Sequence, residues 1–370
     1  MPAYSSNFNG PDSNQPVRVL VVDDSAFLRY TISQYLNQIE GIVVVGTASD
    51  GVEALVVIPE LQPDVVTLDV EMPNLDGIST LRQIMLRFPR PVIMLSSLTK
   101  NGAVETIQAL TLGAVDFVGK PDNRLNIRSV MEEVAAKILR AVQARVKPAS
   151  LVGLNLAPLP PVVKSGPGLR PRQKNDPIVL IGTSTGGPRA LNEVIPALPA
   201  SLGAAVVVVQ HMPAGFTHSL AERLNSLAKL KVKEAQTGDG LEVGQVLIAP
   251  GGFHLLFDDR EQVSLTQTPP VHGVRPAVDV TLTSLVERFG KKVIAVILTG
   301  MGSDGTNGAN LLRSLGGTVI AEHESTCIVW GMPRSVTEKG LASQIVPLPE
   351  AAKAIEEAVQ SQRLSARTVD

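Results

Sequence analysis

Short apolar runs alternate with longer amphipathic stretches in two separate blocks of the chain. The first block extends from about Pro16 to Ala144, and the second extends from Ile178 to residue 362. Short apolar strands separated by helical patterns are typical of parallel sheets with helices on both faces. The pattern therefore predicts two α/β domains in one chain.

The first block contains five strand candidates and five helix candidates. The strands are expected at Val17–Val22, Ile42–Gly46, Val65–Leu68, Val92–Leu95 and Ala114–Val118. The helices are expected at Phe27–Leu36, Val52–Ile58, Ile78–Leu86, Gly102–Leu112 and Ile127–Val142. This order predicts a flavodoxin-like (βα)5 doubly wound domain.

The second block continues the same alternation with different sequence motifs. Its strands are expected at Ile178–Ile181, Ala205–Val209, Val246–Ala249, Val263–Leu265, Val293–Leu298 and Thr318–Ala321. Its helices are expected at Pro188–Ala197, Phe216–Leu227, Val280–Phe289, Gly305–Leu315 and Ala351–Gln360. We predict a second doubly wound domain with a parallel sheet and a more mixed region at Lys231–Thr268.

Three segments fall outside the two blocks. Residues 1–15 are polar, with neither a basic start nor an apolar stretch, so we expect a disordered leader and no signal peptide. Residues 145–177 are rich in proline and in basic side chains, which predicts an exposed, semi-extended linker. Residues 363–370 form a tail, so the domains are expected at 16–144 and 178–362.

Composition narrows the class of protein. Hydrophobic residues make up 44% of the chain but aromatic residues only 3%, so Val, Leu, Ile and Ala must form the cores. The net charge of -2 argues against nucleic acid as a partner. The one cysteine, Cys327, cannot form an internal disulfide and is interpreted as a core residue, which fits the reducing cytoplasm. No apolar run approaches the ~20 residues of a membrane-spanning helix, so no membrane insertion is expected.

Polar groups gather where strands of the first block end. Asp23 and Asp24 follow the first strand, Asp69 follows the third, Ser96 ends the fourth, and Lys120 follows the fifth. Ligands of open α/β sheets bind at these strand ends. Gathered carboxylates suit Mg²⁺, and a carboxylate beside a cation can attack phosphorus. Each residue alone could be a helix cap, a turn residue or a solvated lysine, but together they favour a phosphorylation site.

The first block resembles the response-regulator receiver family. The motifs are Val-Asp-Asp-Ser at Val22–Ser25, Leu-Asp-Val-Glu-Met-Pro at Leu68–Pro73, Leu-Asp-Gly at Leu75–Gly77, Ser-Ser at Ser96–Ser97 and Gly-Lys-Pro at Gly119–Pro121. The resemblance implies that Asp69 accepts a phosphoryl group from a histidine kinase. It implies Mg²⁺ bound by Asp23, Asp24, Asp69 and the main chain of Glu71. It also implies a phosphorylation switch formed by Ser96, Lys120 and Phe117.

A strand followed by a glycine-rich turn and a helix opens the second block. Ile178–Ile181 leads into Gly-Thr-Ser-Thr-Gly-Gly at Gly182–Gly187, and Pro188 suits a first helical turn. The turn fits G-x-S-x-G, in which the glycines permit a tight turn and hold the serine at its tip. It lacks the P-loop lysine and the dinucleotide-binding spacing. The turn alone leaves three interpretations open: Ser184 as a nucleophile, an anion-binding loop, and a plain connection.

A serine nucleophile needs a base, and the base needs an orienting acid. His211 follows an apolar strand, and Asp304 lies in the loop that follows the strand Val293–Leu298. Both residues are therefore expected at carboxyl ends of strands, as Ser184 is. Asp304 could alternatively be a helix N-cap. The chain order Ser–His–Asp differs from that of α/β-hydrolases. We interpret the remaining histidines as structural or substrate-lining residues: His218, His254, His272 and His323.

The second block is similar to the CheB family of chemotaxis methylesterases. The further motifs are Val-Gln-His-Met-Pro-Ala-Gly-Phe-Thr at Val209–Thr217, Ala-Pro-Gly-Gly-Phe-His at Ala249–His254, Arg-Pro-Ala-Val-Asp at Arg275–Asp279, Leu-Thr-Gly-Met-Gly-Ser-Asp-Gly at Leu298–Gly305 and Gly-Met-Pro-Arg at Gly331–Arg334. The resemblance implies a protein-glutamate methylesterase and protein-glutamine glutaminase that needs no cofactor for ester hydrolysis. It implies methyl-accepting chemotaxis receptors as substrates, Ser184, His211 and Asp304 as the triad, and an oxyanion hole at Thr185 or Gly186 and at Met301.

The pairing of the two domains suggests regulation. We expect the unphosphorylated receiver to block the serine centre and phosphate on Asp69 to relieve the block. The alternatives are a non-enzymatic regulator whose glycine-rich loop binds an anion, and an esterase for small soluble esters.

Overall fold

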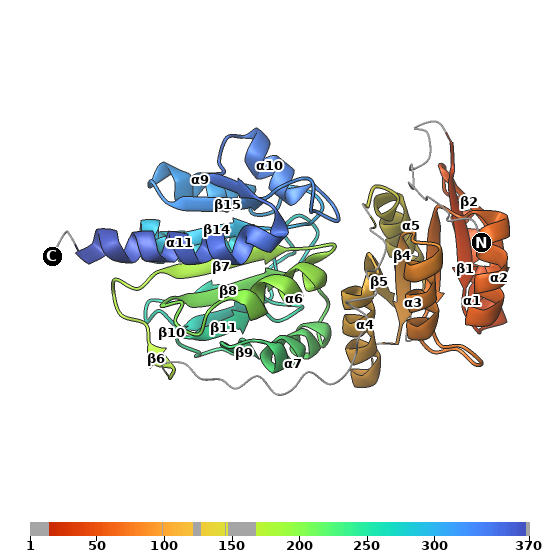
Figure 1. Ribbon diagram of the computed structural model, residues 1–370, viewed down its shortest axis with the longest axis horizontal. Coiled ribbons are helices and arrows are strands. Elements are labelled where there is room, and N and C mark those ends of the chain that lie inside the picture. Colours follow the sequence, from red (N-terminus) through yellow and green to blue (C-terminus); the bar gives the residue numbers. More distant parts are fainter. Residues whose placement is uncertain (1–14, 98, 121–126, 145, 147–167, 368–370) are drawn as a thin grey trace. The chain divides into compact units, whose positions relative to one another are not determined.

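The chain folds into two compact units, Met1–Ala157 and Pro158–Asp370, each with its own sheet (Figure 1). The computed structural model describes residues 15–97, 99–120, 127–144, 146 and 168–367. The expected leader up to residue 14, the linker residues 145 and 147–167, and the last three residues of the tail lie outside the described part. The two units are described separately below.

The first unit is the predicted (βα)5 domain. Its five strands form a parallel sheet in the order β2-β1-β3-β4-β5. The strands are β1 (Val17–Val22), β2 (Ile42–Ala48), β3 (Val65–Asp69), β4 (Val92–Ser96) and β5 (Asp116–Gly119). The helices are α1 (Ala26–Leu36), α2 (Gly51–Leu61), α3 (Gly77–Arg87), α4 (Lys100–Leu112) and α5 (Ile127–Ala141). The strand order reverses between β1 and β3, which is where ligands of such sheets bind.

Polar caps begin four of these helices. The side chains of Ser25, Asp50, Asp76 and Thr99 each accept a hydrogen bond from a backbone N–H in the first turn of the helix that follows. Such caps satisfy N–H groups that have no partner within the helix. They fix where each helix begins, and therefore where the loops after β1, β3 and β4 end.

The second unit contains a seven-stranded parallel sheet in the order β16-β15-β14-β7-β8-β11-β9. Its strands are β7 (Ile178–Thr183), β8 (Ala205–Gln210), β9 (Lys231–Glu234), β11 (Gln245–Ile248), β14 (Val293–Ile297), β15 (Thr318–Glu322) and β16 (Gln344–Val346). The helices are α6 (Gly187–Ala197), α7 (Phe216–Leu227), α8 (Val278–Phe289), α9 (Thr306–Ser314), α10 (Met332–Glu338) and α11 (Leu348–Arg367). Helices α6, α7 and α11 cover one face, and α8, α9 and α10 cover the other (Figure 1). This confirms the predicted doubly wound fold, with the strand order reversing between β7 and β14.

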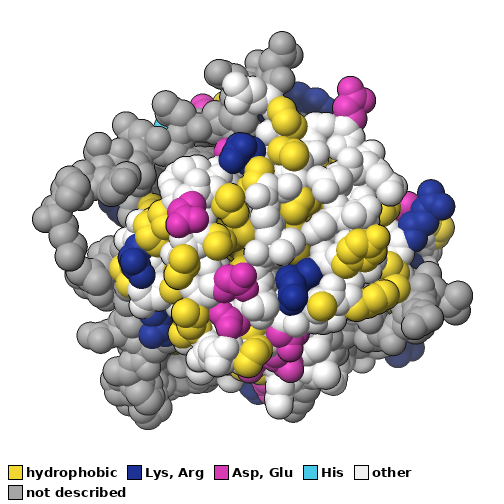
Figure 2. All heavy atoms as spheres, turned by 90° about the vertical axis from the view of Figure 1, so that its right-hand side faces the viewer, with side chains coloured by type: hydrophobic (Ala, Val, Ile, Leu, Met, Phe, Trp, Pro, Cys, Tyr) yellow, Lys and Arg dark blue, Asp and Glu magenta, His cyan; other side chains and the backbone are white. Residues whose placement is uncertain are grey.

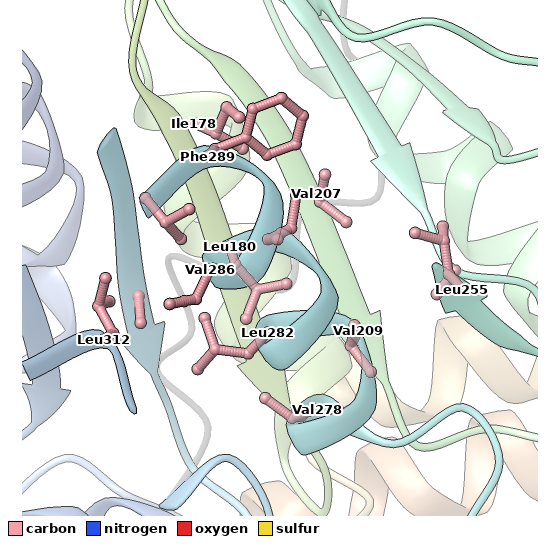
Figure 3. Close-up of a cluster of buried hydrophobic side chains, with 14 of the residues drawn as sticks. Ile178, Leu180, Val207, Val209, Leu255, Val278, Leu282, Val286, Phe289 and Leu312 are labelled. Carbon is pink, nitrogen blue, oxygen red and sulfur yellow. The ribbon is translucent and has the colours of Figure 1, made fainter. Parts of the chain in front are cut away.

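Helix α8 contributes several buried side chains to the hydrophobic core of the second unit. Figure 3 shows Leu282 and Val286 of α8 directed toward Leu180 of β7 and Val207 of β8. All four side chains are buried, in a cluster that extends to Leu312 of α9. Burial of one such side chain contributes about 1.5–3 kcal/mol. The position of α8 on the sheet is therefore strongly determined, which matters for the site described below.

The mixed region predicted at Lys231–Thr268 contains strands that the apolar pattern did not separate. Strand β9 forms an edge of the main sheet, whereas the expected strand at Val263–Leu265 belongs to a separate hairpin of β12 (His254–Phe257) and β13 (Val263–Thr266). Strand β16 and helix α10 were not predicted at all. Edge strands and short helices bury only one side, so their apolar signal is weak.

The end of the expected linker belongs to the second unit. Strand β6 (Arg170–Pro171) pairs with β10 (Glu242–Val243). The Arg170 guanidinium makes two hydrogen bonds to the carboxylate of Asp176, at 2.5 and 2.8 Å. The Arg172 guanidinium lies 4.6 Å from the centre of the Phe289 ring. These contacts attach residues 170–177 to the second unit, which the composition did not indicate, although Pro171 and residues 173–175 are exposed, as expected of a linker.

Among the described residues on the face shown in Figure 2, hydrophobic side chains lie in small groups between charged ones. In the part of the chain that the structure describes, no helix combines the length and apolar character needed to cross a membrane.

Candidate phosphorylation and active sites

The acidic residues of the first unit meet at the carboxyl edge of its sheet. Asp69 ends β3 and is 2% exposed, and Asp23 follows β1 and is 0% exposed. The Lys120 ammonium lies 3.0 Å from Asp23 Oδ2 and 2.7 Å from Asp69 Oδ2. The exposed Asp24 completes a group of three carboxylates whose oxygens lie within 4.8 Å of one another. The strand ends therefore bring together the three side chains that the sequence assigned to a cation.

The charges at this edge are not balanced. Burial raises the pKa of Asp69 to about 6, although Lys120 opposes this shift. Burial alone would lower the pKa of Lys120, but the carboxylates of Asp69 and Asp23 outweigh it and raise that pKa. Lys120 is thus the one cation paired with these carboxylates among the described residues, while the Arg29 guanidinium donates to the main-chain carbonyls of Asp23 and Asp24. A hard divalent cation with oxygen ligands would relieve the excess negative charge, so these residues fit Mg²⁺.

An acidic cavity of about 570 Å³ adjoins the site. It is lined by Asp24, Val70, Glu71, Met72, Pro73, Asp76, Ile78 and Glu105. Burial raises the pKa of Glu105, and the charges of Glu71 and Asp76 raise it further. The N–H of Glu71 lies 3.4 Å from Asp69 Oδ1, which places its main chain at the same site.

The expected switch residues surround the acidic edge. The Ser96 hydroxyl is buried and donates to the carbonyl of Gly102 in α4 at 3.1 Å. The Phe117 ring is buried, with the Lys137 ammonium 5.1 Å from its centre. Lys137 also donates to the Phe117 carbonyl and to Asp116. The hydroxyl thus contacts α4, and the aromatic ring faces inward.

The serine turn of the second unit connects β7 to α6. The Ser184 N–H donates to the carbonyl of Thr299 at 3.1 Å, which joins this turn to the loop after β14. Gly186 has a φ of 80°, and a Cβ there would lie 2.6 Å from Cβ of Ile328. Only glycine tolerates both the left-handed conformation and this close contact. The turn holds Ser184, which is partly exposed, at the edge of the sheet.

Strand register places the backbone of His211 beside that of Ser184. Thr183 pairs with Gln210 in the parallel β7–β8 ladder, and the N–H of His211 donates to the carbonyl of Thr183 at 3.1 Å. Ser184 and His211 are therefore the next residues along two strands about 4.8 Å apart.

Gln210 fixes these two strand ends, and the sequence reasoning missed it. Its Oε1 accepts from the Thr183 hydroxyl at 2.6 Å, and its Nε2 donates to the carbonyls of Ser184 and His211 at 3.0 and 3.1 Å. The side chain is 2% exposed. The one available signal was a polar residue at the end of an otherwise apolar strand.

Asp304 meets His211 from the loop after β14. Nε2 of His211 lies 2.8 Å from Oδ2 of Asp304, and their side chains are 8% and 2% exposed. The Asp304 carboxylate also accepts the N–H groups of Val278, Asp279 and Gly305 at 2.6, 2.8 and 2.9 Å. Val278 and Asp279 begin α8, so the acid lies at a helix N-terminus, where a negative charge is stabilised.

The surroundings of Asp304 keep it ionised. Burial would raise its pKa, but the hydrogen bond and charge of His211, together with the backbone N–H groups, outweigh burial and lower it. Asp304 therefore stays charged at neutral pH and holds a proton on Nε2 of His211. The other ring nitrogen, Nδ1, is left to accept a proton.

The expected oxyanion-hole residues lie on two joined loops. The Thr299 hydroxyl donates to the carbonyl of Thr185 at 3.0 Å, and a Cβ added to Gly300 would lie 2.8 Å from Cβ of Ser184. Met301 follows directly and is 40% exposed. The structure thus brings Thr185, Gly186 and Met301 to the same edge as Ser184.

His272 forms a second histidine–carboxylate pair near Asp304. Its Nε2 lies 2.9 Å from Asp279 Oδ2 and 3.9 Å from Asp304 Oδ1. These three side chains are close enough to suggest a metal site. They do not fit one, because both oxygens of Asp304 already accept two hydrogen bonds each and Asp279 accepts from Gly308, His272 and Asn307.

The remaining histidines have structural or surface contacts. His254 is 0% exposed and accepts the N–H of Ala277 at 3.2 Å through Nδ1. His218 is half exposed beside Glu222 and Glu234, and His323 contacts Ser325.

Comparison with known proteins follows the same division of the chain. The CheB methylesterase family matches residues 179–355, and the response regulator receiver domain family matches residues 19–132. A protein of Symbiobacterium thermophilum named protein-glutamate methylesterase/protein-glutamine glutaminase is 52% identical over 360 residues, covering 93% of this chain and 98% of that protein. A protein of Thermotoga maritima with the same name is 47% identical over 340 residues, covering 90% and 96%.

Proposed function

This chain belongs to the CheB family of protein-glutamate methylesterases/protein-glutamine glutaminases with a receiver domain, and we propose that Ser184, His211 and Asp304 carry out its ester hydrolysis. The enzyme demethylates glutamate methyl esters and deamidates glutamines. The observation that supports the triad most directly is the 2.8 Å pair of His211 and Asp304 beside the strand that presents Ser184. The full-length relatives carry enzyme names, which does not favour the non-enzymatic alternative.

The reaction begins with proton transfer from the Ser184 hydroxyl to Nδ1 of His211. The serine oxygen attacks the γ-carbonyl carbon of the methylated glutamate, and the methoxide leaves with the proton from His211 as methanol. Water then attacks the acyl-enzyme with His211 as base again, which releases glutamate and restores Ser184. A glutamine side chain follows the same course and releases ammonia.

Charge develops on the carbonyl oxygen during both steps. The backbone N–H groups of Thr185 or Gly186 and of Met301 are the proposed donors to this oxygen. Removing one such donor typically lowers turnover by about 10²–10³-fold. Gln210 supports this arrangement by fixing the strand ends that carry Ser184 and His211.

The receiver site is the proposed control point. Asp69 accepts a phosphoryl group from a histidine kinase, and Asp23, Asp24, Asp69 and the main chain of Glu71 hold Mg²⁺, which supplies positive charge when bound. The phosphoryl group adds about -1.5 to -2 charge. Lys120 then pairs with the phosphoryl oxygens. The side chains of the other two switch residues, Ser96 and Phe117, change conformation when the phosphoryl group is present. In this proposal the change relieves a block of the serine centre by the unphosphorylated receiver.

The proposed substrates are methylated chemotaxis receptors, and the proposed compartment is the cytoplasm, where the receptor segments and the kinase would be accessible. No nucleic acid and no membrane insertion enter this proposal. We propose residues 16–144 and 178–362 as the two functional domains, and we extend the second to residues 168–367 because β6 pairs with β10 and α11 continues to Arg367.

Replacement of the nucleophile tests the assignment. We expect Ser184→Ala to abolish methanol release from methylated receptor membranes and to leave phosphorylation of Asp69 unchanged. Ser314→Ala, an exposed serine on α9, serves as the matched control and should behave as the wild type. Methanol release by Ser184→Ala at the wild-type rate would contradict the proposal, and a panel of small esters tests the remaining alternative.

A further inference from the structure

Glu322 is a buried acid of the second unit that the proposed mechanism does not use. It ends β15, and its exposed fraction is 0%. Its Oε2 accepts the N–H of Thr299 at 2.8 Å, and the side chains of Thr326 and Cys327 also hydrogen-bond to the carboxyl. Burial raises the pKa of the carboxyl, and these hydrogen bonds offset this only in part. A group that is costly to bury needs a reason to be retained in this position.

Glu322 accepts a hydrogen bond from Thr299, and Thr299 joins the loop after β14 to the turn that carries Ser184. The Thr299 carbonyl accepts the N–H of Ser184 at 3.1 Å. The Thr299 hydroxyl donates to the carbonyl of Thr185 at 3.0 Å and accepts the N–H of Val329 at 3.0 Å. Thr299 therefore contacts the nucleophile and the next residue through different atoms, while its own N–H is directed to Glu322.

We propose that Glu322 is a positioning residue for ester hydrolysis, which acts through Thr299 to hold the backbone of Ser184 and Thr185 in its reactive position. This inference rests on the proposed function of Ser184. Thr299 lies two residues before Met301, so the same contact also fixes the loop that carries the second proposed oxyanion donor. Without an acceptor at residue 322, the Leu298–Thr299 peptide loses this hydrogen bond, and any shift of Thr299 moves the carbonyl and hydroxyl that contact Ser184 and Thr185.

The role requires an acceptor oxygen and no negative charge. Glu322→Gln keeps an oxygen that can accept the Thr299 N–H in a side chain of the same shape, so we expect kcat within about 3-fold of the wild type. Glu322→Leu fills similar volume without an acceptor. Since a displacement of about 1 Å can lower the rate by about 10²-fold, we expect kcat to fall by about 10–100-fold with little change in KM.

Ser284→Ala provides a matched control for general destabilisation. The Ser284 hydroxyl on α8 accepts the N–H of Phe257 at 2.9 Å and is buried in the same unit. Its loss also leaves a buried backbone N–H without an acceptor, but this N–H is not bonded to the serine turn. We expect Ser284→Ala to lower the melting temperature while kcat per folded molecule stays at the wild-type value.

The experiment uses the full chain with Mg²⁺ and a small-molecule phosphodonor. It measures methanol release from methylated receptor membranes, and the rate constant for reaction of Ser184 with a serine-directed phosphonate. The phosphonate end point counts the competent sites, so partial unfolding does not affect kcat. Glu322→Met, whose thioether sulfur is only a weak acceptor, replaces Glu322→Leu if the latter does not fold.

Three results are informative. Loss of both rates in Glu322→Leu or Glu322→Met, with rescue in Glu322→Gln and no loss in Ser284→Ala, supports the inference. Wild-type rates in the leucine or methionine variant, or equal losses in the glutamine variant, overturn it. A wild-type protein that neither reacts with the phosphonate nor releases methanol overturns the proposed function itself.

Discussion

Asp304→Asn tests the proton chemistry of the site without removing a hydrogen-bonding side chain. Oδ1 of Asp304 accepts the N–H groups of Asp279 and Gly305, and Oδ2 accepts Val278 N–H and His211 Nε2. Asparagine offers one oxygen and one NH2 group for these four donors. If its oxygen faces Asp279 and Gly305, its NH2 faces His211, and Nε2 must then accept a hydrogen bond instead of donating one.

The change of tautomer determines the expected magnitude. With Nε2 as an acceptor, the neutral imidazole of His211 carries its proton on Nδ1, and Nδ1 cannot take the proton of Ser184. In a serine protease, the same substitution lowers kcat by about 10⁴-fold while the geometry is kept. We therefore expect Asp304→Asn to lower kcat by about 10³–10⁴-fold. The NH2 group also faces the Val278 N–H, which should cost about 1–3 kcal/mol of unfolding free energy.

The pH dependence of stability provides a second readout. The pKa of Asp304 is lowered below 3.8 in the folded protein. The stabilisation from its charge is therefore fully present above pH 3.8 and is lost as the pH falls through the lower folded value. Asp304→Asn should lack this part of the acid transition, which denaturant unfolding at several pH values can measure.

Asp279→Asn is the control for this substitution. Asp279 is a neighbouring buried carboxylate that also accepts a backbone N–H, from Gly308, and a histidine, His272. Its replacement should lower stability to a similar extent but leave methanol release within about 3-fold of the wild type, because His211 keeps its partner. The reasoning is refuted if Asp304→Asn retains more than about a tenth of wild-type kcat at neutral pH.

Three other regions can be tested in the same way. In metal-free protein, the raised pKa of Asp69, about 6, means that the receiver loses up to about 3 kcal/mol as the pH rises from 3.8 through 6; denaturant unfolding should show this slope in the wild type and not in Asp69→Asn. Gln210→Leu removes three hydrogen bonds from the strand ends and should lower kcat for methanol release by about 10–100-fold; an unchanged kcat would contradict its assigned role. A fragment beginning at residue 168 should unfold at higher denaturant concentration than one beginning at residue 178, which lacks the Arg170–Asp176 pair; equal midpoints would show that this segment does not stabilise the unit.

The residues that the sequence identified share one property. Asp69, Ser184 and His211 each follow a short apolar strand, and the carboxyl ends of parallel strands meet at one edge of a sheet. Strand pattern and residue type were therefore enough to place Asp69 at the edge of the first sheet, and Ser184 with His211 at the edge of the second. Strands β7 and β8 end at Thr183 and Gln210, slightly beyond the predicted ends at Ile181 and Val209, and their register explains why Ser184 and His211 are neighbours.

The residues that the sequence did not reveal act through contacts between distant segments. Glu322 lies in Ala-Glu-His-Glu, where it resembles an ordinary surface charge, and its partner Thr299 is 23 positions away. The role of Gln210 depends on two loops that converge only in the folded sheet. The segment near Arg170 has the composition of a linker, and only its pairing with β10 shows that it is packed. Local patterns contain none of this information.

The first turn of α8 and the proposed catalytic carboxylate depend on each other. The backbone N–H groups of Val278 and Asp279 stabilise the ionised acid, and the acid in turn accepts hydrogen bonds from buried N–H groups that have no partner within the helix. Helix ends are where local melting usually begins. Warming that frays this turn would therefore inactivate the enzyme before the domain unfolds, and hydrogen–deuterium exchange at these two amides would follow the loss of activity directly.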